Sequence, residues 1–173
     1  MTMLEIAMRM WPLWLFGMFM MLMTYKAGHG DLLKVDKKRL KKWIIFLGFL
    51  SVYRYLMLKY TGFNEAMGAL TIPWQAAFTV SWEDACHGLP LALLYRFVCT
   101  KKYAKFIMWP AIAVVMTAFG LGHTYQGIWA AAFLSLYVPF TYDFGKKHGF
   151  GTVMIGHILY DLVTLLLIHW MAG

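Results

Sequence analysis

Six ionisable side chains interrupt stretches of sequence that are otherwise strongly apolar. They are Glu83, Asp84, His87, His123, His157 and Asp161. Residues four positions apart share a helix face, so Glu83 pairs with His87 and His157 pairs with Asp161 if both segments are helical. A carboxylate beside an imidazole is suited to general acid–base catalysis. A second pair of this kind, facing the first, can stabilise a developing negative charge.

The rest of the chain must place these groups in an apolar surrounding. Hydrophobic residues make up 61% of the 173 positions and charged residues only 14%. Soluble domains have roughly 25% charged residues. A soluble domain of this size leaves much of its surface exposed to water, so it cannot hide so much apolar side chain. The composition therefore predicts an all-α, polytopic transmembrane helical bundle with membrane lipid as its surroundings.

Six apolar stretches are close to the length of about 20 residues that a helix needs to cross a bilayer. They are Leu4–Tyr25, Trp43–Tyr60, Ile72–Val98, Phe106–Gly122, Gln126–Tyr142 and Gly151–Met171. No repeat, low-complexity segment or soluble domain interrupts them. The sequence thus predicts a single membrane domain over residues 1–173 with about six spans.

The basic residues support this count. They gather in the first, third and fifth of the intervening loops, as Lys26, Lys34, Lys37, Lys38, Arg39, Lys41, Lys42, Lys101, Lys102, Lys105, Lys146 and Lys147. Six spans place these three loops on one side, and the excess of Lys and Arg predicts that this side is cytoplasmic. The expected location is a plasma (inner) membrane. The net charge of +8 therefore reflects topology, and we expect no nucleic-acid partner.

Ionisable residues inside a membrane cost at least about 2.5–3.5 kcal/mol each on insertion scales, so they usually face a cavity and serve a function. The other interpretation is a purely structural one, in which the same groups bond neighbouring helices to each other. Three predicted spans share the six groups. Their number and helical spacing favour a functional site built from Glu83, His123, His157 and Asp161, with Asp84 and His87 in supporting positions.

Two short motifs resemble those of the CPBP family of membrane proteases, which includes the CaaX prenyl proteases and the bacteriocin-processing proteases. Phe119-Gly-Leu-Gly-His123 is similar to the family's F-x-x-x-H motif and is followed by the polar turn Thr-Tyr-Gln-Gly. His157-Ile-Leu-Tyr-Asp161 resembles the H-x-x-x-N/D motif. Trp82-Glu83-Asp84 stands where the family has paired glutamates. The resemblance covers residues 72–171, and the first two spans lie outside it.

The first motif departs from the family pattern E-E-x-x-x-R-G. In one register Glu83 is the first glutamate, Asp84 replaces the second and Gly88 stands in place of the arginine. In the other register His87-Gly88 aligns with Arg-Gly, and Trp82 replaces the first glutamate. We prefer the first register because Glu83 is the only glutamate in the predicted membrane core. The second would indicate a divergent or inactive member.

The resemblance implies a glutamate-type intramembrane endopeptidase that needs no metal or other cofactor. Glu83 would take a proton from water and His123 would help to hold that water. His157 and Asp161 would stabilise the negative charge on the scissile carbonyl. Asp161 would either donate a hydrogen bond in its protonated form or, when ionised, orient His157.

Three alternatives remain. Glu83, His123, His157 and Asp161 offer ligands that zinc accepts, although no H-E-x-x-H helix is present. A non-catalytic CPBP-like protein in an immunity or scaffold role would use the same groups for packing. The third alternative is a proton-coupled carrier, although the sequence shows no inverted repeat of the kind expected in such carriers. The sequence leaves open the peptide or membrane-protein substrate and the oligomeric state.

The distance of each site residue from the basic end of its span gives a further expectation. Helical counting from the basic loops places Glu83 and His123 about 26 Å into the membrane and His157 only about 15 Å. An extended stretch over residues 148–152 would almost close this gap. The sequence therefore predicts a non-helical start to the last span.

Overall fold

The computed structural model describes residues 3–45, 48–49, 52, 77, 82–124 and 128–172. These residues form helices and contain no strand, which confirms the all-α prediction. The elements are α1 (Met3–Lys26), the 3₁₀ helix η1 (Gly30–Leu33), α4 (Trp82–Val98), α5 (Ala104–Gly122), α6 (Ile128–Ser135), α7 (Tyr137–His148) and α8 (Phe150–Ala172). Residues 37–45 are also helical.

Several of these helices correspond to predicted spans. Most of the second span, Trp43–Tyr60, and the first part of the third, Ile72–Val98, lie outside the described residues. The fifth is divided at Leu136 into α6 and α7. Among the described residues one helix, α5, is long and apolar enough by itself to cross a membrane, and Phe150–Leu166 forms a shorter apolar helix. The count of six spans stays a prediction.

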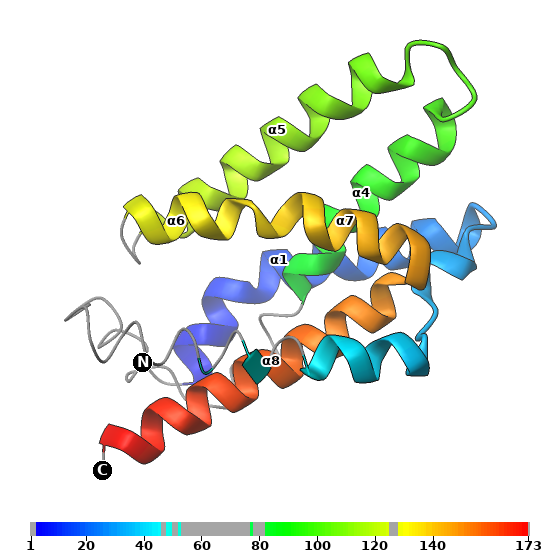
Figure 1. Ribbon diagram of the computed structural model, residues 1–173. Helices are drawn as coiled ribbons and strands as arrows, with labels where there is room; N and C mark the ends of the chain where they lie inside the picture. Colours follow the sequence, from blue (N-terminus) through cyan, green and yellow to red (C-terminus); the bar gives the residue numbers. More distant parts are fainter. Residues whose placement is uncertain are drawn as a thin grey trace.

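Helix α4 lies at the centre of the bundle and packs against α1, α5, α7 and α8 (Figure 1). Its small residues Ala85, Gly88 and Ala92 recur at helical spacing and are buried. Small residues allow helix backbones to approach closely, which is how helices associate where water supplies no driving force. The same close approach places the first turns of α4 against α8.

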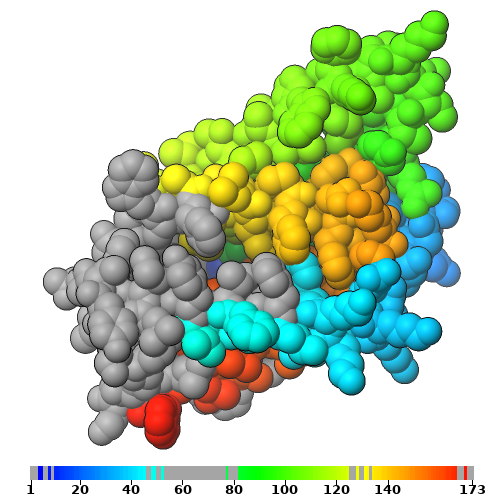
Figure 2. Space-filling view, viewed as in Figure 1, coloured from blue at the N-terminus to red at the C-terminus, as the bar shows by residue number. Residues whose placement is uncertain are grey.

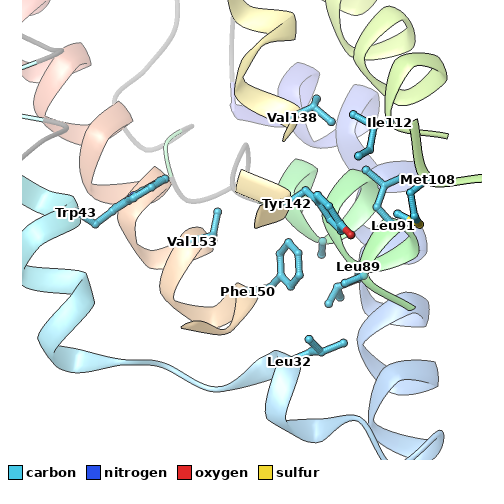
Figure 3. Close-up of a cluster of buried hydrophobic side chains, with 12 residues drawn as sticks. Leu32, Trp43, Leu89, Leu91, Met108, Ile112, Val138, Tyr142, Phe150 and Val153 are labelled. Atoms are coloured by element: carbon cyan, nitrogen blue, oxygen red, sulfur yellow. The ribbon is translucent and has the colours of Figure 1, made fainter. Parts of the chain in front are cut away.

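Phe150, the first residue of α8, fixes the position of the α7–α8 turn. Its ring is fully buried beside Tyr142 and Leu89 (Figure 3). A Cβ atom added at Gly88 would lie 2.1 Å from this ring, and one added at Gly145 would lie 2.6 Å from it. Both glycines are therefore needed to admit Phe150 between α4 and α7.

The predicted non-helical start of the last span is wrong. Only Gly149, with a φ of 90° that favours glycine, separates α7 from α8, and residues 150–152 are helical. The position of His157 along the bundle axis, level with Glu83 and His123, is explained by the α7–α8 turn. Phe150 contacts Gly88, which lies ten residues before the end of α4 at Val98, or about 15 Å along the helix. The turn itself is thus set deep beside α4, and no extended backbone is needed.

The basic segments meet at one end of the bundle. Arg96, near the end of α4, pairs with Asp31 of η1. The backbone N–H of Asp36 donates to Thr152 Oγ1 at 2.7 Å, and the Asp36 carboxylate lies 3.4 Å from His148 Nδ1. Lys146 lies 4.3 Å above the ring of Tyr95. The ends of α1, α4 and α7 consequently share one side of the molecule (Figure 1).

Asp36 also begins the helix of residues 37–45. Its Oδ1 accepts the backbone N–H groups of Lys38 and Arg39, each at 3.1 Å, which is the geometry of an N-cap. The Arg39 N–H, together with that of Lys38 and the nearby His148, lowers the pKa of Asp36. A lowered pKa means that this capping stabilises the fold above the carboxyl's usual pKa and is lost as the pH falls through the lowered value.

Trp43 anchors the same helix on the last span. Its ring is stacked on Phe140 at 5.0 Å and lies 4.5 Å from Phe144, both on α7. A Cβ atom at Gly156 would lie 1.9 Å from Trp43. Gly156 directly precedes His157, so this contact helps to set the position of α8 at the level of the ionisable residues.

Candidate active site

The structure brings the six predicted residues into one cluster. Glu83, Asp84 and His87 lie on the first two turns of α4, and His123 caps the C-terminus of α5. His157 and Asp161 lie one turn apart on α8. Four contacts between side chains join these residues into two groups, Glu83 with His123 and His157 with Asp84, His87 and Asp161. The neighbouring positions of Glu83 and Asp84 on α4 bring the two groups together. Three segments that are far apart in the sequence therefore supply a single group of ionisable side chains.

Glu83 and His123 form one half of the cluster. His123 Nδ1 donates to the backbone carbonyl of Phe119 at 2.8 Å, because a carbonyl can only accept. In the neutral ring this bond leaves Nε2 as an acceptor, 3.9 Å from Glu83 Oε2. Two acceptors at this separation can each receive one proton of a single water molecule whose oxygen lies about 2.8 Å from both. This arrangement suits the activation of a water molecule.

His157 forms the other half and is held between two carboxylates. Its Nδ1 lies 2.9 Å from Asp84 Oδ2, and its Nε2 lies 3.2 Å from Asp161 Oδ2. Asp84 is fully buried and His157 is 9% exposed. A buried imidazole with a carboxylate on each nitrogen is fixed in both position and orientation.

The two halves are close enough for their charges to interact. The carboxylate of Glu83 interacts electrostatically with His157, Asp84 and Asp161. Glu83 and His123 keep 19% and 15% of their side chains exposed, whereas Asp84 has none. The cluster is thus fully buried at Asp84, whereas the side chains of Glu83, His123 and Asp161 are partly exposed and the Glu83 Oε2 atom is itself buried.

Two neighbours on α7 complete the cluster, and no pattern in the sequence pointed to either. Thr141 Oγ1 lies 3.2 Å from His87 Nε2. The ring of Tyr137 lies 5.2 Å from the ring of His157 and 6.1 Å from that of His87. Threonine and tyrosine are common in apolar helices, so only the packing of α7 against α4 shows that these two side chains face the site.

The donor set does not resemble a metal centre. Within the part of the chain that the structure describes, no group of three or more His, Cys, Asp and Glu side chains is arranged to hold a metal ion. Glu83 and His123 face each other as a pair, while His157 uses both ring nitrogens on carboxylates. The geometry is that of hydrogen-bonded acids and bases.

Comparison of the chain with protein-family models, with curated proteins and with solved structures finds no match.

Proposed function

We propose that this chain is a glutamate-type intramembrane endopeptidase that resembles the CPBP proteases. The observation that carries the proposal is the Glu83–His123 pair, in which Nε2 and the buried Oε2 lie 3.9 Å apart and Oε2 has no hydrogen-bond partner among the described residues. Glu83 takes a proton from a water molecule that is also held by His123. The water oxygen attacks the scissile carbonyl carbon, and the proton then passes to the leaving amide nitrogen as the C–N bond breaks.

The opposite half of the cluster stabilises the tetrahedral intermediate. Without substrate, both nitrogens of His157 already contact carboxylates. The Nε2–Asp161 contact is the longer of the two, so the carbonyl oxygen of the substrate takes the place of Asp161 at Nε2. His157 acts in its protonated form, in which both ring nitrogens carry a proton, so that Nε2 donates to the developing oxyanion while Nδ1 donates to Asp84. Asp161 in its protonated form adds a second donor.

A membrane environment is part of the proposal. Only 17% of the apolar window in α5 is buried within the protein, whereas the core helix of a soluble protein would be mostly buried. Large apolar side chains such as Phe106, Trp109 and Val114 are largely exposed. Figure 2 shows bulky side chains of α5 projecting from the surface. Apolar surface of this extent is what lipid contact requires.

We expect the three basic segments, near Lys38, Lys102 and Lys147, to face the cytoplasm, because they share one end of the bundle and carry most of the positive charge. Single cysteines at these positions, in a chain whose Cys86 and Cys99 are replaced by alanine, should react with membrane-impermeant maleimide only after cells are opened. Labelling of any of the three in intact cells would contradict the six-span topology.

Comparative proteomics of membranes tests the enzymatic proposal. Cells expressing the wild-type chain are expected to contain peptide termini that are absent when Glu83 is replaced by Gln, because Gln keeps the shape of the side chain but cannot accept a proton. Equal amounts of folded protein in the two membranes are the control. Identical sets of termini would contradict the proposal.

One observation favours the non-catalytic alternative, an immunity or scaffold role. His157 is bonded at both nitrogens, so the closed network also works as a link between α4 and α8. A scaffold would tolerate Glu83→Gln, since this residue lies outside the His157 network's direct contacts. Comparison of the wild type with Glu83→Gln therefore distinguishes a peptidase from a scaffold.

A further inference from the structure

The carboxylate that orients His157 comes from a different helix than its sequence motif indicates. The motif pairs His157 with Asp161, one turn later on α8. In the structure His157 Nδ1 instead contacts Asp84 of α4 at 2.9 Å, and Asp161 is on Nε2 at 3.2 Å. The two carboxylates thus occupy opposite sides of the imidazole, and their roles can be assigned separately.

Burial distinguishes the two carboxylates. The side chain of Asp84 is completely buried, while that of Asp161 is 17% exposed. A substrate carbonyl can displace Asp161 from Nε2, but it has no access to Nδ1.

Asp84 also lies beside the buried ring of His87. Its Oδ1 is 3.6 Å from His87 Nε2, which is too long for a hydrogen bond, and this oxygen has no hydrogen-bond partner among the described residues. His87 Nε2 is 3.2 Å from Thr141 on α7. His87 is only 6% exposed, and its ring packs against Phe119 at 5.1 Å. Asp84 is thus enclosed by packed side chains, and its short contact with His157 Nδ1 sets the orientation of the carboxylate.

We propose that Asp84 is the positioning residue of His157: it accepts the Nδ1 proton and so directs Nε2 at the scissile carbonyl, while Asp161 is the group that the substrate displaces. The proposal rests on the proposed peptidase function. It assigns Asp84 the part that the buried aspartate has in a Ser-His-Asp triad, where it orients the histidine and stabilises its imidazolium form. It also gives the second acidic position of the first motif a role separate from that of Glu83.

Histidine NMR tests the assignment without any need for activity. Protein labelled with ¹⁵N-histidine is compared as wild type, Asp84→Asn, Asp161→Asn and the control Asp143→Asn, an equal change at an exposed carboxylate on α7. The His157 signals are identified by their loss in His157→Gln. We expect a strongly hydrogen-bonded Nδ1 proton in the wild type, in Asp143→Asn and in Asp161→Asn, and its loss or large upfield shift in Asp84→Asn.

Kinetics on the same proteins give the second measurement. Asp84→Asn is expected to lower kcat by about 10²–10⁴-fold with a much smaller change in KM, since a neutral amide can neither orient His157 as the carboxylate does nor stabilise its imidazolium form. If Asp84→Asn yields too little folded protein, the retained Nδ1 signal in Asp161→Asn still supports the assignment. Loss of that signal in Asp161→Asn and not in Asp84→Asn would overturn it.

The two measurements also separate this inference from the proposed function. If the wild-type enzyme is active but its His157 Nδ1 signal is unchanged in Asp84→Asn, the role assigned to Asp84 is wrong. The peptidase proposal is then unaffected. If the NMR shifts are as expected but the proteomic comparison shows no peptide cleavage, the peptidase proposal is wrong. The catalytic role of Asp84 is then wrong as well, although its contact with His157 is confirmed.

Discussion

Replacement of Glu83 by Gln is expected to lower the kcat of the purified, lipid-reconstituted protein by roughly 10²–10⁴-fold, the usual contribution of a general base. The glutamine would keep the size of the side chain that lies 3.9 Å from His123 Nε2, but its amide cannot take a proton from water. KM should change much less than kcat, because the water-activating group contributes to the transition state and little to substrate binding. The substrate is a peptide identified from the proteomic comparison.

Two controls sharpen this experiment. Glu5→Gln makes the same change at an exposed position on α1, so its activity should equal that of the wild type. A strong chelator should leave the wild-type rate unchanged if the mechanism uses only Glu83 and His123. Activity that is lost with chelator and restored by zinc would point to a metalloenzyme. Full activity in Glu83→Gln would remove the mechanism proposed here.

Replacement of Phe150 by Ala should lower the free energy of unfolding by about 3–5 kcal/mol, the usual cost of truncating a buried phenylalanine, because Phe150 is the largest of the fully buried side chains that the structure describes. The ring is fully buried and fills the space that Gly88 and Gly145 leave open. Its removal leaves a cavity between α4, α7 and α8. Thermal unfolding in detergent, followed by circular dichroism, measures the effect.

Phe106→Ala is the matched control, because Phe106 is 82% exposed and its loss opens no cavity. Gly88→Ala tests the same contact from the other side. The added Cβ would lie 2.1 Å from the Phe150 ring, so overpacking should cost about 1–3 kcal/mol or more. If Gly88→Ala and Phe150→Ala both unfold like the wild type, the position assigned to the α7–α8 turn is incorrect.

Much of the fold class and the membership of the site could be read from local sequence. Composition predicted an all-helical chain, and helical spacing predicted that His157 and Asp161 share a face of one helix, which the 3.2 Å contact between them bears out. The fourth predicted span, Phe106–Gly122, ended directly before His123, which caps α5 in the structure. These features depend only on residue type and on neighbours within a few positions.

Other features could not be predicted because they depend on contacts between distant segments. Asp84 had only a supporting position in the sequence-based prediction, and nothing local indicated that it would lie 2.9 Å from His157. The extended start predicted for the last span was wrong for the same reason. Counting residues along one helix cannot show how deep a neighbouring turn is set.

The sequence by itself therefore determined which side chains can do acid–base chemistry, and that apolar helices carry them. The tertiary structure decided which carboxylate faces which nitrogen of His157. That choice follows from the approach of α8 to α4, which is set where the ring of Phe150 enters the space at Gly88 and Gly145. The physical reason is that helical periodicity fixes the direction of each side chain on its own helix, while the register between two helices is fixed only by their packing.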